Sequence, residues 1–189
     1  MFNLFRRRNG AHAVAVEPEM NAPLEETSID APHEFSADVE IEAPIERIFE
    51  LLDFGSEGNA LRERGFRIVD ITDTPQGFRR FTGLDPDMPT IIFTFTLEHY
   101  QPPYAIAFKT TFSNQEKLGG LRDSRSVYVL SDLGDGMVRV QQTELARFRE
   151  ELTEEELSME QSLMGIAIYN ELARLKLHAE IGPEAATLS

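Results

Sequence analysis

Glu144 is the residue whose type and position point most directly to acid–base chemistry. It lies in an alternating run, residues 137–148, in which Val138, Val140 and Gln142 share its parity and therefore face the same way. A carboxyl group among apolar neighbours loses hydration, so its pKa rises toward the range useful to a general acid or base. The alternative is a structural role, because bending near the strand end would return Glu144 to solvent or pair it with an arginine.

His99 is the second candidate for proton transfer. It ends a run, residues 90–99, whose odd-numbered positions are large and apolar: Ile91, Phe93, Phe95 and Leu97. Continued alternation turns His99 toward the same apolar face. The spacing places no serine or carboxylate beside it, so a hydrogen-bonded histidine at the rim of a core is the alternative interpretation.

The composition excludes several other kinds of chemistry. The chain has no cysteine, which removes thiolate nucleophiles, disulfides and cysteine-ligated metals, and it has only four histidines. No metal-binding, phosphate-binding or serine-hydrolase motif occurs, so we expect no metal and no cofactor. The 33 acidic and 18 basic residues give a formal net charge of -15. That charge repels phosphate backbones, so we expect no nucleic-acid partner.

The elements that must position these residues follow from hydrophobic periodicity and turn chemistry. Residues 35–42 alternate like a half-buried strand, and Pro44 suits the start of a helix over residues 45–52. A second short helix covers residues 56–64 and ends at Gly65. Turn residues then separate six further strands: 66–73, 78–83, 90–99, 104–112, 124–130 and 137–148.

One long helix closes the chain. Thr153 and Glu156 form a capping box at its start, and Gly182 ends it about 28 residues later. One face is predicted to cover the sheet: Leu157, Gln161, Met164, Gly165, Ile168, Leu172 and Leu175. Glu160, Glu171, Arg174 and His178 make a separate charged seam. The element order predicts an α+β fold in which a seven-stranded antiparallel sheet curls around this helix.

Residues 39–52, with the sequence VEIEAPIERIFELL, resemble the opening strand, "AP" and first helix of the SRPBCC superfamily, the START/Bet v 1-like helix-grip proteins. The spacing of the later elements agrees with this resemblance over residues 35–182. The resemblance implies an apolar cavity between the sheet and the long helix. In the family such a cavity takes lipids, sterols, quinones or polyketide-like molecules.

Nine side chains are candidates to line that cavity, because strand parity or the helical face directs them inward: Phe93, Phe95, Tyr104, Phe108, Gln142, Glu144, Gln161, Met164 and Ile168. For the large apolar members of this set, ordinary core packing is the alternative interpretation.

Three functional hypotheses follow. The first is binding or transport of a hydrophobic small molecule, with no reaction. The second, implied by some relatives, is an enzyme of the polyketide cyclase/aromatase type in which Glu144 and His99 move protons. The third is a protein-interaction module of the co-chaperone type that presents an acidic surface to a basic partner.

The chain ends lack the periodicity of the domain. We expect a disordered tail over residues 1–34, the domain over 35–182, and a C-terminal tail over 183–189. Phe2 to Arg8 combine apolar and basic residues, a composition that permits weak contact with a membrane surface or with an acidic partner. A disordered start is the interpretation we favour for so short a segment. The sequence has no spanning segment and no signal-peptide core, so we expect a cytoplasmic protein. It leaves the oligomeric state undetermined: residues 163–168 are apolar nearly all round and require cover from the tail, the short helices or a second subunit.

Overall fold

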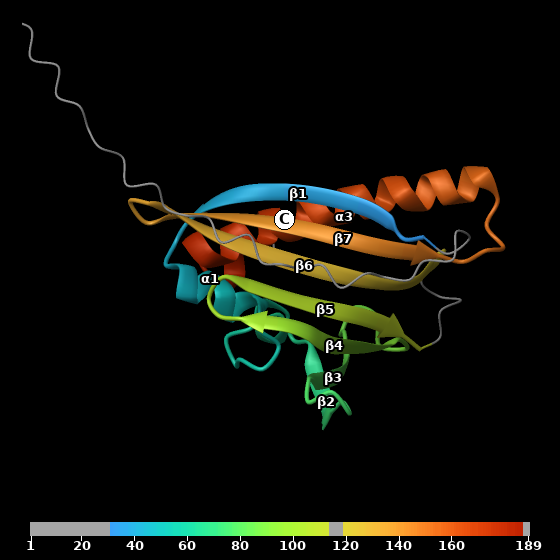
Figure 1. The fold of residues 1–189 in the computed structure, drawn as a ribbon, viewed down its shortest axis with the longest axis horizontal. Helices are drawn as coiled ribbons and strands as arrows, with labels where there is room; N and C mark the ends of the chain where they lie inside the picture. The colour runs from blue at the N-terminus through green and yellow to red at the C-terminus, as the bar shows by residue number, and fades with distance from the viewer. Residues whose placement is uncertain (1–30, 114–118, 187–189) are drawn as a thin grey trace, which may run out of the picture.

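Seven antiparallel strands form one curved, open sheet that partly wraps a long helix in the computed structural model (Figure 1). The structure describes residues 31–113 and 119–186. The strand order is β1-β7-β6-β5-β4-β3-β2, so strands adjacent in sequence are also adjacent in the sheet, except that β1 joins β7. This arrangement confirms the predicted α+β helix-grip architecture.

The elements have the following bounds in chain order: β1 His33–Glu42, α1 Ile45–Leu52, α2 Ala60–Glu63, β2 Arg67–Asp73, β3 Arg79–Leu84, β4 Ile92–Gln101, β5 Ala105–Phe112, β6 Leu121–Gly134, β7 Met137–Phe148, α3 Glu154–Glu180 and α4 Pro183–Ala186.

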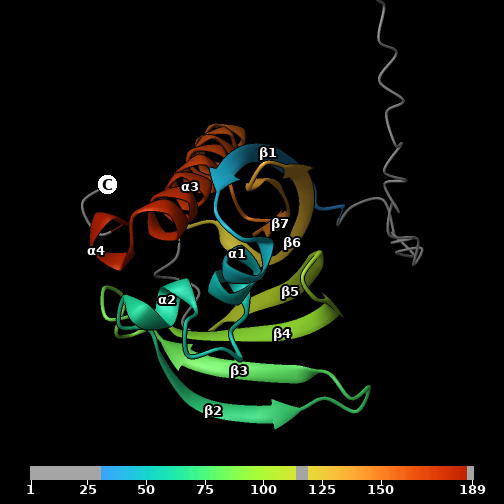
Figure 2. The same ribbon diagram turned by 90° about the vertical axis from the view of Figure 1, so that its left-hand side faces the viewer.

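The short helices α1 and α2 close one end of the curved sheet (Figure 2). Pro44 directly precedes α1 with a φ of -57°, a backbone angle that suits the start of a helix. Ile48 and Phe49 are buried against the sheet. Asn59 caps α2 by accepting hydrogen bonds from the first-turn amides, and its Nδ2 donates to the Leu51 carbonyl at 3.0 Å. This bond ties α2 to α1.

Helix α3 runs along β1 and β7 on the inner side of the sheet (Figures 1 and 2). The capping box of Thr153 and Glu156 is confirmed. The Thr153 side chain accepts a hydrogen bond from the Glu156 backbone amide, and the Glu156 carboxylate accepts one from the Thr153 backbone amide. Near the far end, Lys176 Nζ donates to the Glu40 carbonyl at 2.6 Å. Gly182, with a φ of 127°, then turns the chain in a conformation that favours glycine.

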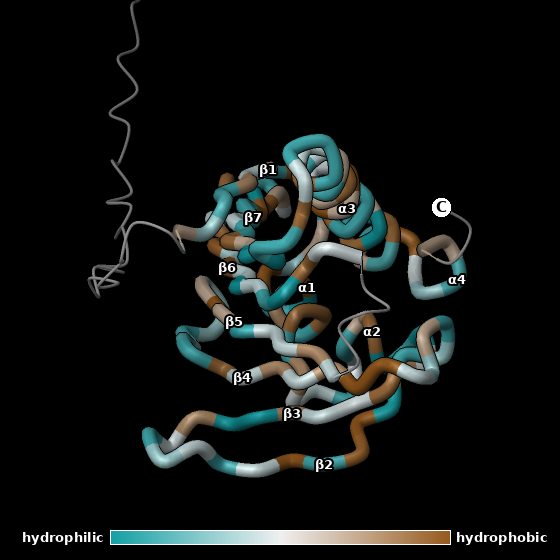
Figure 3. The backbone as a smooth tube through the Cα atoms, turned by 90° about the vertical axis from the view of Figure 1, so that its right-hand side faces the viewer, coloured by the Kyte–Doolittle hydropathy of each residue, from teal (hydrophilic) through white to brown (hydrophobic). Residues whose placement is uncertain are grey.

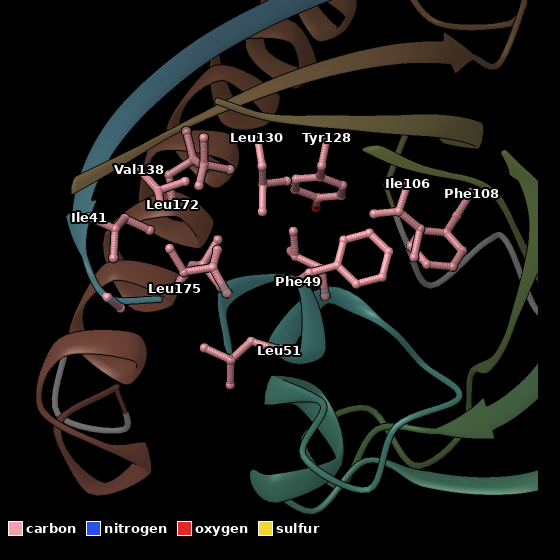
Figure 4. Packing of buried hydrophobic residues seen from close by; sticks show 14 of the residues in the cluster. Ile41, Phe49, Leu51, Ile106, Phe108, Tyr128, Leu130, Val138, Leu172 and Leu175 are labelled. Carbon is pink, nitrogen blue, oxygen red and sulfur yellow. The ribbon is translucent and has the colours of Figure 1, made fainter. Parts of the chain in front are cut away.

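The main core lies between the sheet, α1 and the C-terminal half of α3. Figure 4 shows Leu172 and Leu175 of α3 directed toward Ile41, while Phe49 of α1 points toward Tyr128. All five side chains are buried. This close packing of side chains fixes the position of α3 against the sheet. The position of α3 in turn determines where space remains beside the helix.

The β2–β3 hairpin lies at the β2 edge of the sheet, where hydrophilic and hydrophobic residues mix along the chain (Figure 3). Six of the seven β2 residues are exposed, Val69 and Ile71 among them, while Phe81 and Gly83 of β3 are buried. The strand β2 therefore lies largely outside the core.

The structure differs from the sequence-based expectation at a few boundaries. β6 covers Leu121–Gly134 rather than 124–130, because it stays paired with β7 along almost the whole length of that strand. Residues 183–186 form α4 rather than a tail, and Ala186 is buried. The predictions for residues 1–30, including membrane contact through Phe2 to Arg8, lie outside the described residues. Within 31–113 and 119–186, no helix has the length and apolar character needed to cross a bilayer.

Candidate ligand-binding cavity

A cavity of about 520 Å³ lies between the inner face of the sheet, the α1–α2 region and α3. Strands β4 to β7 supply one wall, while α3 and α4 supply the other. Its volume falls within the range of ligand pockets in proteins, roughly 300–1,000 Å³. The α3 side chains that line the cavity extend from Met164 to His178.

An aromatic cluster forms the apolar wall. Phe54, which follows α1, stacks on Phe95 of β4 with ring centroids 4.1 Å apart. Phe108 of β5 meets Phe54 edge to face at 5.1 Å, and Phe93 lies parallel to Phe95 at 6.3 Å. Each pair contributes about 0.5–1.5 kcal/mol beyond burial of its area. The rings support one another, so the wall is held in place without a ligand.

Glu144 is a buried acid that lines the same cavity as the aromatic wall. Its side chain is 5% exposed, and it faces Ser126 of β6 in the strand register. Burial raises the pKa of its carboxyl group, while hydrogen bonds from Ser124 and Ser126 act in the opposite direction. Its Oε2 has no hydrogen-bond partner among the described residues. Glu144 is therefore poised to meet a donor that enters the cavity.

Gln142 and Tyr128 connect the sheet to α3 beside Glu144. Both side chains are buried and lie opposite each other in the register of β6 and β7. The Tyr128 hydroxyl donates to Oε1 of Glu171, and Gln142 Nε2 donates to Oε2 of the same carboxylate at 3.1 Å. Burial and then the charge of Glu171 raise the pKa of Tyr128 well above its usual range, so it stays protonated.

The acceptor atom of Gln142 is the second uncommitted group in the cavity. Because its amide nitrogen is held by Glu171, its Oε1 is left without a donor in the described part of the chain. Gln142 Oε1 and Glu144 Oε2 lie on the same face of β7, two residues apart. Together they offer a pair of buried hydrogen-bond acceptors.

Charged groups from α2 and α3 lie at the other side of the cavity. His178 Nε2 is 2.5 Å from Oε2 of Glu63, which joins α3 to α2. Arg64 and Arg174 line the cavity as well, and burial followed by the charge of Arg174 lowers the pKa of Arg64. Arg64 and Arg174 therefore place positive charge at this side of the cavity, next to its apolar lining. In the described ranges, no three His, Asp or Glu side chains are grouped as metal ligands.

The structure brings together seven of the nine side chains singled out from the sequence, all of which line the cavity: Phe93, Phe95, Phe108, Gln142, Glu144, Met164 and Ile168. Tyr104 does not, because it precedes β5 at the turn and is 52% exposed. Gln161 lies near the start of α3, where its amide contacts His33 Nδ1 at 3.0 Å instead.

His99 also lies outside the cavity lining. A β-bulge between Leu97 and His99 shifts the pairing of β4 with β5, so simple alternation no longer holds at this point. His99 pairs with Ala107, whereas the cavity-lining Phe108 pairs with Leu97. The bulge carries no sequence signal in this strand, which explains why the parity argument misplaced His99.

Several lining residues were not identified from the sequence. Glu171, Arg174 and His178 were recognised as a charged seam beside the apolar face of α3, and that seam turns out to border the cavity. On the helical wheel these residues lie next to Ile168 and Leu175 of the apolar face. That neighbourhood is the feature of the sequence that could have placed them in the cavity lining. Tyr128 was not assigned a direction because both faces of its strand are apolar.

Comparison with solved structures places this architecture among helix-grip proteins. The chain superposes on the ZhuI aromatase/cyclase from Streptomyces sp. R1128 with a TM-score of 0.58, 14% identity, and coverage of 78% of this chain and 93% of the other. It matches norcoclaurine synthase from Thalictrum flavum with a TM-score of 0.56, 8% identity, and coverage of 82% and 96%.

A third match is DynU16, a protein of the dynemicin biosynthetic locus, with a TM-score of 0.53 and 14% identity. The match covers 79% of this chain but 48% of DynU16, so the chain spans about half of that protein. No family model and no curated protein sequence matches the chain. At these identities the similarity establishes the fold alone.

Proposed function

We propose that this helix-grip protein binds a hydrophobic small molecule in the cavity between the sheet and α3. The observation that carries the proposal is the cavity itself, about 520 Å³ in volume, with a wall of mutually packed phenylalanines and a small number of buried polar groups. That combination is typical of ligand sites, in which apolar area supplies affinity and a few polar atoms orient the ligand.

The polar groups indicate the chemistry of the ligand. Gln142 Oε1 and Glu144 Oε2 are acceptors that lack donors within the described residues, and each such buried group costs about 1–3 kcal/mol unless it is paired. A ligand with an apolar body and a hydroxyl or amine group would pair them. A sterol, a phenolic polyketide or a hydroquinone meets this requirement. Among the described lining residues, the arginines that a fatty-acid carboxylate would meet are Arg64 and Arg174.

The second candidate function is a reaction of the cyclase/aromatase type. One observation favours it: Glu144 is a buried carboxyl group with a raised pKa beside an apolar cavity. The raised pKa brings this carboxyl group closer to the range in which a general acid or base works. Tyr128 and Glu171 would be the neighbouring hydrogen-bonding groups, since His99 lies outside the lining. ZhuI, which shares the fold, is an aromatase/cyclase.

Native mass spectrometry of the purified protein, followed by organic extraction, tests the binding proposal most directly, because a protein of this kind retains ligand through purification. Thermal denaturation with oleate, cholesterol and naphthol, compared with methoxynaphthalene as a probe without a donor, then tests the ligand chemistry. At a hundred times its Kd, a ligand adds about 2.7 kcal/mol to stability. We expect naphthol to raise Tm more than methoxynaphthalene does.

A variant pair locates the site. Phe95→Leu keeps most of the apolar surface but removes the stacked ring, so it should change the ranking of the probes with little loss of stability. Val69→Leu, at an exposed position of β2, serves as its control. A protein that carries no copurifying molecule and whose Tm responds to none of the probes would contradict the proposal.

A further inference from the structure

The outward face of α3 carries a second apolar stripe that the described part of the domain does not cover. Three of its large side chains are more than half exposed, Met159 56%, Leu163 52% and Ile166 56%, and Tyr169 beside the stripe is 67% exposed. The opposite face of the same helix is buried in the core through Ile168, Leu172 and Leu175. A helix that is apolar on both faces is normally covered on both.

The spacing of the stripe is that of a coiled-coil seam. Met159, Leu163, Ile166, Asn170, Ala173 and Leu177 follow one another at separations of four, three, four, three and four residues. This is the alternation of d and a positions in a heptad repeat, sustained over about 27 Å of helix. Core packing does not require the pattern, since these helical positions lie opposite those of the buried Ile168, Leu172 and Leu175.

The surroundings of the stripe are unusually free of charge for this chain. The sequence QSLMGIAIYN, residues 161–170, contains no charged side chain, although 27% of all residues are charged. Charged residues are depleted at the centre of protein interfaces. A solvated helix surface in a protein with a net charge of -15 would be expected to carry several of them.

We propose that α3 is the interface of a homodimer in which two copies of this chain pack α3 against α3 in parallel and in register. The heptad spacing selects another straight helix as the partner, and a second copy presents the same spacing. A parallel, in-register pair places Asn170 opposite Asn170 of the second copy. A single asparagine at an a position favours this two-stranded arrangement, since the two amides can hydrogen-bond each other.

The proposed interface adjoins the cavity. Ala167, Asn170 and Arg174 line it, and Asn170 also belongs to the stripe. A second copy would therefore lie beside this part of the cavity lining. The interface does not rest on the ligand proposal, because the other five residues of the stripe do not line the cavity.

Sedimentation velocity of the full chain over about 1–100 µM, a range suited to an interface of modest area, is the first test. We expect a concentration-dependent monomer–dimer equilibrium. Ile166→Glu should weaken the dimer by at least about tenfold. Ile71→Glu in β2 is a matched control, because it changes the same residue type at the same 56% exposure and adds the same charge. Ile71→Glu should leave the dimer unchanged.

Disulfide trapping is the second test and reads the orientation. The chain has no cysteine, so Met159→Cys, at one end of the stripe, introduces a single thiol. In a parallel, in-register pair the two thiols face each other and should cross-link under mild oxidation, whereas in an antiparallel pair they lie at opposite ends of the interface. Ile71→Cys, at the same 56% exposure, should not cross-link. A monomer at every concentration, equal weakening by both glutamate variants, or a dimer that Met159→Cys does not cross-link would each overturn the proposal.

Discussion

Glu144 is placed in the cavity by strand alternation, and it is only 5% exposed there. Burial is the largest influence on its pKa and favours the neutral form. Its folded-state pKa is therefore raised above the value in the unfolded chain. The stability contribution of the neutral carboxyl group is fully present below the unfolded pKa and is lost as pH rises through the folded pKa.

Replacing Glu144 with glutamine should remove this pH dependence. Each unit by which burial raises the pKa costs the folded protein about 1.4 kcal/mol once Glu144 ionises. We expect Glu144→Gln to be more stable than the wild type at pH 8, with the difference disappearing below about pH 4. Urea titrations across this pH range measure the effect.

The control for this prediction is Glu155→Gln, which removes an exposed carboxylate in the first turn of α3. Its effect should not follow the same pH profile. If the Glu144→Gln variant were less stable than the wild type at pH 8, the carboxylate would be stabilised in place rather than strained by burial. In the enzyme alternative, the same variant should lose turnover while retaining ligand affinity.

At the scale of elements, two glycines show how closely the strands and helices approach. Gly83 of β3 leaves room for the Phe66 ring, since a Cβ atom there would lie 2.2 Å from it, and 2.9 Å from the Arg67 carbonyl oxygen. Gly165 of α3 is the opposite case. A Cβ atom at Gly165 meets nothing within 4 Å among the described residues.

The two positions should therefore respond to alanine in opposite directions. Gly83→Ala should destabilise the protein by about 1–3 kcal/mol, because Phe66 must leave its packed position beside Phe93. Gly165→Ala should stabilise it by up to about 1 kcal/mol through helix propensity. Chemical denaturation measures both. Equal responses would contradict the packing described here for β3 or for α3.

At the scale of the whole molecule, charge is the dominant long-range feature. A net charge of -15 on 189 residues makes the folded chain repel itself. Exposed ion pairs such as Arg139 with Glu40 are weakened by salt, but solvent screening leaves each of them with little effect on stability. The net repulsion should therefore decide the response to ionic strength.

We expect Tm to rise when potassium chloride is raised from low to moderate concentration, since the Debye length falls to about 8 Å at physiological ionic strength. Differential scanning calorimetry at constant pH measures the change. Arg139→Gln, which removes an exposed ion pair, should respond to salt like the wild type. A Tm that falls with salt would show that local ion pairs outweigh the net charge.

The sequence by itself determined the order of elements and most of the inward positions of the strands. Alternation in β7 correctly directed Gln142 and Glu144 inward, and the capping box marked the start of α3 at Thr153. These features depend on interactions within a strand or a helical turn, which local patterns encode. The same locality explains why residues 159–177 reveal their heptad spacing without any structure.

Tertiary structure alone decided which inward residues border open space and which are packed core. A bulge removed His99 from the expected face, the turn exposed Tyr104, and contact with His33 held Gln161 away from the cavity. The partnership of Tyr128 with Glu171 joins residues 43 positions apart. Such features arise from how a curved sheet and a straight helix diverge in space, and no local sequence pattern records that divergence.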